Sequence, residues 1–219
     1  MKVVAVVPMK LNNERLSNKN TNAFDNGEPL CNYILKTLQN VAGIDEIYVY
    51  CSNPKIKEYI PEGIKYLRRK ESLDTSQTKM NEVLECFAKD VDADVYLMTH
   101  TTSPFISSKS IEEALKKVTS EEYDSALAVH CVQEFLWKDG SPFNYDLTNI
   151  PRTQDLEPLY SETSGFYIYN RNIILDYQRR IGFNPYLKEV SKIESIDIDE
   201  PEDFEIANAI YQNMYRKED

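Results

Sequence analysis

The chain opens with an uninterrupted apolar run, Val3 to Val7, that ends at Pro8. A strand covered on both faces of a parallel sheet has this character, because neither face meets water. A helical stripe follows at residues 29–40, where apolar side chains recur every three or four positions after Pro29, a residue suited to a first helical position. A strand followed by a helix in this way is typical of the opening of a βαβ unit.

The same alternation of strand and helix patterns continues along the chain. The patterns predict further strands at 46–51, 64–67, 95–98, 125–129, 166–169 and 195–198, and helices at 78–88, 108–118, 172–179 and 201–215. Between them, residues 131–163 are irregular and rich in aromatic residues and proline, which indicates an inserted arm. We therefore expect a single α/β domain over residues 1–219, with a mainly parallel sheet and one inserted arm.

Length and cysteine usage place the chain among ordinary globular proteins. The apolar run at the start is too short for a signal sequence or a membrane span, so we expect a cytoplasmic protein that does not enter a membrane. The four cysteines are widely scattered and form no Cys-x-x-Cys pair. We expect them to be reduced, mostly packed thiols.

The formal net charge of −11 is unevenly distributed. It argues against binding to nucleic acid or to an anionic membrane, because both require a basic face. The first twenty residues are the exception. Lys2, Lys10, Arg15 and Lys19 against Glu14 give this segment +3, which leaves −14 for the rest of the chain. A polyanionic ligand is therefore expected to bind near this segment.

The loop from Pro8 to Asn20 connects the first strand to the first helix. Its thirteen residues include three cationic side chains and four asparagines, at positions 12, 13, 18 and 20. Such a loop lies at the carboxyl edge of a parallel sheet, where ligands bind, and its donors suit a triphosphate. A solvated loop without a ligand is the alternative. The chain has no Gly-x-Gly and no Gly-Lys-Ser/Thr, so a dinucleotide-binding fold or a P-loop is not expected.

Two aspartates near the C-terminus form a candidate metal site. If residues 195–198 are a strand, Asp197 and Asp199 point to one side while Ile196 and Ile198 enter the core. Two carboxylates on one side can hold Mg²⁺, with water and nucleotide phosphates as its other ligands. The alternative is that Asp199 caps the last helix in a capping box with Glu202.

A polar segment, His100 to Pro104, follows the predicted strand at 95–98. Its imidazole and hydroxyl groups would lie at the ligand edge, where they can bind a pyrimidine or a ribose. A loop held by local Ser and Thr hydrogen bonds is the alternative. Arg152 and Tyr160 lie in the aromatic arm, and the sequence leaves open whether they belong to a core or to an interface.

Taken in order, these segments resemble the acylneuraminate cytidylyltransferases, or CMP-sialic acid synthetases. The opening motif of that family, Pro-Ala-Arg-Gly-Gly-Ser-Lys-Arg-Leu-Pro-Gly-Lys-Asn, is in register with Pro8 to Asn20. The motifs Gln-Pro-Thr-Ser-Pro, Arg-x-Gln-Asp-Leu, Asn-Gly-Ala-Ile-Tyr-Ile and Asp-Ile-Asp-x-Pro-Glu-Asp are similar to residues 100–104, 152–156, 163–168 and 197–203. The resemblance covers nearly the whole chain.

The resemblance implies a three-layer nucleotide-diphosphosugar transferase fold and a homodimer in which the arm packs on the partner subunit. It also implies a nucleotidyltransferase reaction. A hydroxyl of a 2-keto-3-deoxy sugar acid, similar to sialic acid, attacks the α-phosphorus of CTP and gives a CMP-sugar and pyrophosphate. Positioning and charge neutralisation would then supply most of the catalysis.

The resemblance also implies roles for individual residues. Lys10 and Lys19 would act on the phosphates with help from Arg15, and Asp197 with Asp199 would hold Mg²⁺. The nucleotide would contact Lys10, Asn13, Asn20, Arg69, His100 and Ser103. The sugar acid would contact Gln154, Asp155 and Tyr160.

Some positions depart from the family pattern and keep other functions open. Leu11 and Asn12 replace the two loop glycines, Glu14 replaces a phosphate-binding lysine, and His100 replaces a glutamine. One alternative is an enzyme of the same fold with another nucleotide or acceptor, such as a phosphorylated metabolite. A second is a nucleotide-binding protein without turnover. A third is a glycosyltransferase with an Asp-x-Asp metal motif. That motif normally follows a middle strand, whereas the candidate here lies near the C-terminus.

Overall fold

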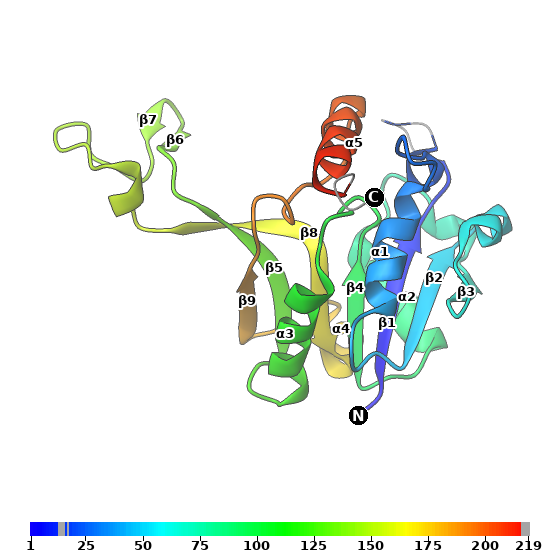
Figure 1. Ribbon diagram of the computed structural model, residues 1–219. Helices are drawn as coiled ribbons and strands as arrows, with labels where there is room; N and C mark the ends of the chain where they lie inside the picture. The colour runs from blue at the N-terminus through cyan, green and yellow to red at the C-terminus, as the bar shows by residue number, and fades with distance from the viewer. Residues whose placement is uncertain (13–15, 17, 216–219) are drawn as a thin grey trace.

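A computed structural model describes residues 1–12, 16 and 18–215 of the chain (Figure 1). Within these residues the central sheet has seven strands in the order β3-β2-β1-β4-β8-β5-β9. Their bounds are Val3–Met9 for β1, Glu46–Cys51 for β2, Lys65–Arg68 for β3, Val95–Thr99 for β4, Ser125–Val132 for β5, Leu159–Asn170 for β8 and Pro185–Glu189 for β9. Only β8 runs antiparallel to its neighbours β4 and β5, which confirms a mainly parallel sheet.

Helices cover both faces of this sheet and give the predicted three layers. Helices α1 (Leu30–Gln39) and α3 (Ser108–Thr119) pack on one face, and α2 (Met80–Asp90) with α4 (Arg171–Tyr177) pack on the other. Short 3-10 turns occur at Lys19–Thr21, Pro54–Tyr59, Glu71–Leu73 and Thr153–Asp155. No helix in the described part of the chain has the length and apolar character needed to cross a bilayer.

Strand β1 shows why the apolar run at the start of the chain is a central strand. All seven of its residues are buried. Its side chains alternate between the two cores, with Ala5 and Val7 on the face of α1 and α3, and Val4 and Val6 on the face of α2 and α4. Both faces of this strand are dry, so the run needs no polar residue until the chain leaves the sheet at Lys10.

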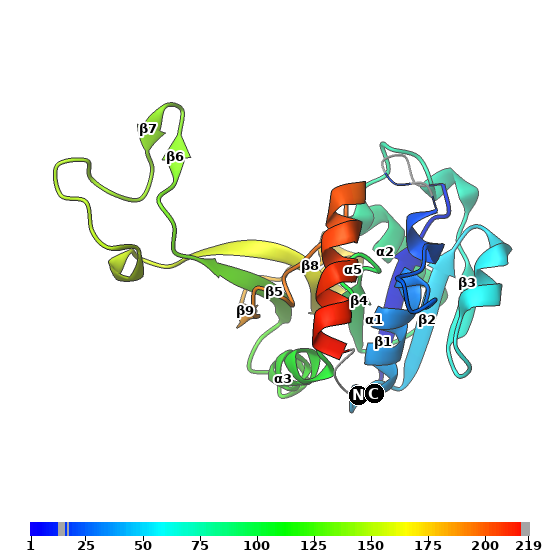
Figure 2. The same ribbon diagram turned by 45° about the horizontal axis from the view of Figure 1, so that its top comes forward.

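Helix α5 (Pro201–Tyr215) closes the fold beside α1 (Figure 2). It completes a third apolar cluster in which Ala207 packs with Phe24, Leu30 and Ile198. The first turn of α5 is capped from within, because the Asp203 carboxylate accepts hydrogen bonds from the backbone N–H groups of Asp199 (2.9 Å) and Glu200 (2.8 Å). Asp203, and not Glu202, is therefore the carboxylate that turns back on the start of this helix.

The irregular segment forms an arm that projects away from the body of the molecule in both views (Figures 1 and 2). Its base is the extended pair of β5 and β8, and its tip carries the short strands β6 (Trp137–Lys138) and β7 (Ser141–Pro142). Asp139 and Gly140 join these two strands, both with positive φ (51° and 77°). Asp-Gly favours this kind of hairpin turn.

The predicted strand at 195–198 is wrong. In the described structure residues 196–199 belong to no strand, and the seventh strand of the sheet is β9, which pairs in parallel with β5. The alternation of isoleucine and aspartate has another cause, since Ile198 is buried and Ile196 partly buried in the cluster beneath α5. The segment is half-buried as its pattern indicates, but it packs on a helix and not in a sheet. The strand geometry expected to point Asp197 and Asp199 to one side is therefore absent from these described residues.

Candidate active site

The carboxyl edge of the sheet brings the loop after β1 against the segment before α5. Lys19 is only 8% exposed. Its Nζ donates a hydrogen bond to the carbonyl oxygen of Ile198 (2.8 Å) and pairs with Asp199 Oδ1 (3.2 Å). A lysine predicted to bind phosphate and a carboxylate predicted to bind a metal therefore lie side by side, although they are 180 positions apart in the chain.

Asn20 connects the same loop to the end of β4. Its Nδ2 donates to the carbonyl oxygen of Lys10 (2.7 Å), and its Oδ1 accepts from Thr101 Oγ1 (2.5 Å). Asn20 and Thr101 are both buried. Paired polar groups in a buried place fix the geometry of the segments that carry them. Asn20 thus holds Lys10 and the polar segment after β4 at one edge.

Arg69 follows β3 and is 4% exposed. Its Nε (3.1 Å) and Nη2 (2.5 Å) both donate to Asp74 Oδ1, and Ser52 Oγ donates to Asp74 Oδ2 (2.5 Å). Ser52 and Asp74 line a cavity of about 410 Å³ that also includes Leu11 and Asn12 of the loop after β1. The predicted nucleotide-binding arginine therefore supports the wall of a cavity next to the candidate phosphate loop.

Asp197 has the most informative carboxylate of the site. Its Oδ2 accepts a hydrogen bond from Ser164 Oγ (2.9 Å), whereas Oδ1 is buried and has no hydrogen-bond partner among the described residues. A buried carboxylate oxygen without a partner is costly, and a bound cation removes that cost. Asp197 therefore fits a divalent ion.

The residues around Asp197 also limit what kind of metal site this can be. Among the described residues, no group of three or more His, Cys, Asp or Glu side chains comes together at a metal-binding distance. An ion held by Asp197 and Asp199 would take its remaining ligands from water or from substrate phosphates. Mg²⁺ binds in this way in nucleotide sites.

His100 lies at the end of β4, beside Ser103, which is 1% exposed. Burial lowers the pKa of His100 to about 4, and the positive charges of Arg180 and Lys19 add to this, while Asp199 opposes it. The imidazole is therefore neutral near pH 7. In that state it is a hydrogen-bonding group at the carboxyl edge, and not a cation.

A trio of residues on the β8 side of the site was missed by the sequence analysis. Tyr167 is buried, and its hydroxyl donates to Glu162 Oε1 and also lies 3.2 Å from the carbonyl oxygen of Thr163. Arg180 lies with its guanidinium 3.9 Å from the centre of the Tyr167 ring. Burial raises the pKa of Tyr167, so the phenol is protonated. The only sequence signal for Arg180 is an Arg-Arg pair in an acidic chain.

The residues predicted to bind the sugar acid lie along the arm and its base. Gln154, Asp155 and Tyr160 are exposed, and Arg152 binds Asp155 through its Nε (2.7 Å) and Nη2 (2.9 Å). Gln154 and Asp155 lie in the projecting segment between β7 and β8 (Figure 1), whereas Tyr160 lies in β8, four residues before Ser164, which binds Asp197. Asn13 and Arg15, together with Glu14, lie outside the described residues.

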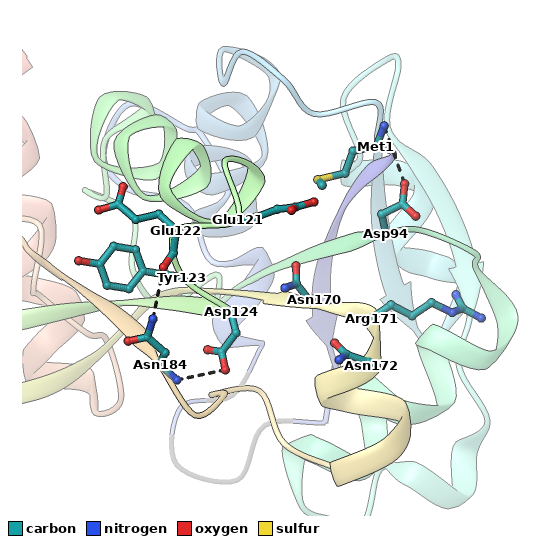
Figure 3. A pocket seen from close by; sticks show the side chains of 10 residues that line it. All are labelled: Met1, Asp94, Glu121, Glu122, Tyr123, Asp124, Asn170, Arg171, Asn172 and Asn184. Atoms are coloured by element: carbon teal, nitrogen blue, oxygen red, sulfur yellow. Dashed lines mark hydrogen bonds and ion pairs between the residues drawn. The ribbon is translucent and has the colours of Figure 1, made fainter.

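A second cavity, of about 540 Å³, lies at the opposite edge of the sheet (Figure 3). It is lined by several acidic side chains, but two of these hold the backbone in place. Asp94 Oδ2 accepts from the N–H of Lys2 (2.6 Å), and Asp124 Oδ2 accepts from the N–H groups of Phe183 (2.6 Å) and Asn184 (3.1 Å). The candidate site therefore remains at the carboxyl edge.

Comparison with known proteins agrees with this architecture. The N-acylneuraminate cytidylyltransferase of Streptococcus agalactiae serotype V is 25% identical over 93% of this chain and 52% of its own length. The chain thus spans about half the length of that relative. The CMP-N,N'-diacetyllegionaminic acid synthase of Legionella pneumophila is also 25% identical, over 97% of each chain.

Solved structures show the same fold. The CMP:2-keto-3-deoxy-manno-octonic acid synthetase complexed with CTP is similar with a TM-score of 0.77, at 19% identity, over 97% of this chain and 99% of that one. The sequence profile of the family described as Cytidylyltransferase matches residues 4–219. Because that match extends over nearly the whole chain, the protein belongs to the cytidylyltransferase family.

Proposed function

We propose that the protein is a CMP-sugar synthetase, which transfers the cytidylyl group of CTP to a 2-keto-3-deoxy sugar acid of the nonulosonic type. The observation that carries this proposal is the pairing of buried Lys19 with Asp199, two residues along the chain from Asp197 and its unpaired oxygen. A cation and two carboxylates at one edge suit a triphosphate and its metal ion. The names of the streptococcal and Legionella relatives support a sialic or legionaminic type of acceptor.

CTP would lie across the β1 side of the carboxyl edge. Lys10 and Lys19 would face the triphosphate, and the family resemblance assigns Arg15 and Asn13 to the same ligand. Arg69, His100 and Ser103 would surround the base and the ribose, and Asn20 would hold the loop against the nucleotide. The fixed positions of Asn20 and Arg69 support this arrangement, because both are buried and hydrogen bonded.

Asp197 and Asp199 would hold Mg²⁺. When bound, the ion would neutralise phosphate charge and so favour the departure of pyrophosphate. Ser164 fixes the orientation of Asp197 through its hydrogen bond to Oδ2, and Lys19 fixes Asp199 in the same way. The two carboxylates are therefore already oriented before any ligand binds.

The reaction joins one oxygen to phosphorus and releases another. The acceptor hydroxyl attacks the α-phosphorus of CTP and gives up its proton to water, and the bond from that phosphorus to the bridging oxygen of pyrophosphate breaks. Little covalent chemistry falls to the protein in such a transfer, so positioning and charge neutralisation do most of the work. The cations of the β1 loop would stabilise the charge that develops on the leaving pyrophosphate.

The arm would join two copies of the chain into a homodimer. It exposes several large apolar side chains, among them Trp137 at 59% and Phe143 at 55%, with Leu147 and Ile150 nearby. Exposed apolar surface of this kind marks an interaction site. In a dimer, Gln154 and Asp155 of the projecting segment would reach the partner's acceptor site, together with Tyr160. Sedimentation equilibrium should show a dimer that Trp137→Glu weakens.

We assign the reaction to the cytoplasm. All four cysteines are free thiols, and Cys31 and Cys51 are buried. Unpaired cysteines fit a reducing compartment, since disulfides persist mainly in oxidising ones.

Pyrophosphate release with Mg²⁺ tests this function. The four nucleoside triphosphates are each combined with a panel of nonulosonic and octulosonic acids, and Asp197→Asn is the matched control. Release that requires CTP and one sugar acid supports the proposal. Release with another nucleotide or a phosphorylated acceptor would assign a different reaction to the same fold. CTP binding without release from any acceptor would indicate a nucleotide-binding protein.

A further inference from the structure

A cationic cavity of about 380 Å³ lies on the β8 side of the carboxyl edge. Its charged lining consists of Lys79, Arg179, Arg180 and Glu162, which gives a net charge of +2. The chain as a whole carries −11. A local excess of positive charge in an acidic protein indicates the binding of an anion.

Arg180 is the cation of this cavity that lies against Tyr167 of the central sheet. Its Nη2 donates to the Tyr167 hydroxyl (3.2 Å) and to Glu162 Oε1 (3.3 Å), while the guanidinium stacks on the Tyr167 ring. The side chain is 25% exposed. Its Nε and Nη1 make no hydrogen bond within the described part of the chain. The group is therefore oriented in advance and still has donors to offer.

Arg180 lies on the β8 side of His100, opposite the candidate triphosphate cations. Tyr167, on which it stacks, pairs with Met98 of β4, two residues before His100. Tyr167 also lies three residues after Ser164, whose hydroxyl binds Asp197. In the strand order, Lys19 follows β1 and Arg69 follows β3, whereas Tyr167 belongs to β8 on the other side of β4. The candidate triphosphate cations and Arg180 therefore flank His100 from opposite sides.

We propose that Arg180 binds the carboxylate of the acceptor. This inference rests on the proposed function and names a residue that determines its substrate class. In a 2-keto-3-deoxy sugar acid, the carboxylate is bonded to the same carbon that carries the attacking hydroxyl. A fixed guanidinium that holds the carboxylate also sets the distance from that hydroxyl to the α-phosphorus.

Steady-state kinetics of Arg180→Gln test the inference. We expect the KM for the sugar acid to rise about 10- to 100-fold, the range for the loss of hydrogen bonds to a charged group. The KM for CTP should remain within about twofold, and Arg180→Lys should recover part of the loss. Lys89→Gln, which removes the same charge from an exposed pair on α2, is the matched control and should behave as wild type. A raised KM for CTP alone would overturn the inference.

The methyl ester of the same acid separates binding of the carboxylate from a structural role. Wild type should bind the ester more weakly than the acid. The ratio of these two affinities should be about the same as the ratio between wild type and Arg180→Gln for the acid. The variant itself should not distinguish acid from ester. If Arg180 only supported Tyr167, both substrates would suffer equally in the variant, and the inference would be wrong. Circular dichroism melting confirms that each variant is folded.

The turnover of wild type decides the proposed function separately. If wild type releases pyrophosphate and Arg180→Gln keeps its KM for the acid, only the inference fails. If wild type is inactive, calorimetric titration with N-acetylneuraminic acid still tests the site. Binding that is lost in Arg180→Gln supports the inference, whereas equal binding, or no binding to either form, overturns it.

Discussion

The two edges of the sheet both carry acidic side chains and a cavity, but they use them differently. At the amino edge, Asp94 and Asp124 accept hydrogen bonds from backbone N–H groups and so hold the chain together. At the carboxyl edge, Asp197 keeps a buried oxygen without a partner among the described residues, and Lys19 is buried against Asp199. The density of charge is therefore a poor guide to a site. What distinguishes the carboxyl edge is a polar group that the protein itself does not satisfy.

The largest expected effect is on catalysis at the carboxyl edge. Asp197→Asn keeps the shape of the side chain but removes its charge, so we expect kcat/KM for CTP and the sugar acid to fall at least about 100-fold. The melting temperature should change little or rise, because a buried charge is lost. Pyrophosphate release and thermal melting measure the two quantities. Full activity in this variant would remove Asp197 from the site.

A second change tests whether the nucleotide side of the edge depends on a buried ion pair. Asp74→Asn leaves Arg69 without its carboxylate, and loss of one partner of a mostly buried pair should lower the free energy of unfolding by about 2–3 kcal/mol. The KM for CTP should rise, because an amide offers one acceptor oxygen to Arg69 and Ser52 where the carboxylate offered two. Urea denaturation and steady-state kinetics check both. An unchanged unfolding midpoint would show that the pair is not structural.

A substitution at the amino edge should lower stability and leave activity unchanged. Asp124→Asn weakens the hydrogen bonds that Phe183 and Asn184 donate, which should lower the free energy of unfolding by about 1–2 kcal/mol. Activity should be unchanged, since this edge would bind no substrate. Urea denaturation and pyrophosphate release are measured on the same preparation. A loss of kcat/KM at unchanged stability would contradict the comparison between the two edges.

The last expected effect concerns pH, and it is the smallest of the four at neutral pH, because it develops only on acidification. The folded-state pKa of His100, about 4, lies below its ordinary value of 6.5. Between those values the unfolded chain takes up a proton that the folded chain does not, so this residue makes stability fall as the pH drops from about 6.5 to 4. His100→Gln should remove that part of the pH dependence of unfolding.

Proton NMR measures the titration of His100 directly. The chain has two histidines, so a His130→Gln variant assigns the signals. The ring signals of His100 should show no titration near pH 6.5. An ordinary titration of His100 would show that its ring lies in water, which would weaken its assignment to the site.

The sequence predicted the strands and helices that pack between the sheet and its helix layers. The apolar run of β1 and the stripe of α1 each follow from a single periodic pattern, because every residue faces either a helix layer or the sheet. Strand β9 escaped prediction because it is an edge strand that begins at a proline and alternates half-exposed and exposed residues. The pattern around Ile196 and Ile198 was misread for the converse reason, since its apolar side packs on α5.

The candidate site also contains residues that the sequence predicted and one that it did not. The loop after β1 and the Asp-x-Asp segment were found because polar residues followed apolar runs at one edge, and the structure brings Lys19 to Asp199. Arg180 was not found, because it reaches the site from the loop after α4 by stacking on Tyr167. Contacts of this kind depend on tertiary structure and leave no local pattern in the sequence.

Binding of Mn²⁺ with CTP, followed by NMR line broadening, tests the central comparison most directly. The paramagnetic ion replaces Mg²⁺ and broadens the signals of nearby residues. If CTP and its metal bind at the carboxyl edge, the signals of His100, Ser103 and Ile198 should disappear first, and Asp197→Asn should prevent this. Broadening that begins at Asp94 and Asn184 would place the metal nucleotide at the amino edge and contradict the assignment of the site.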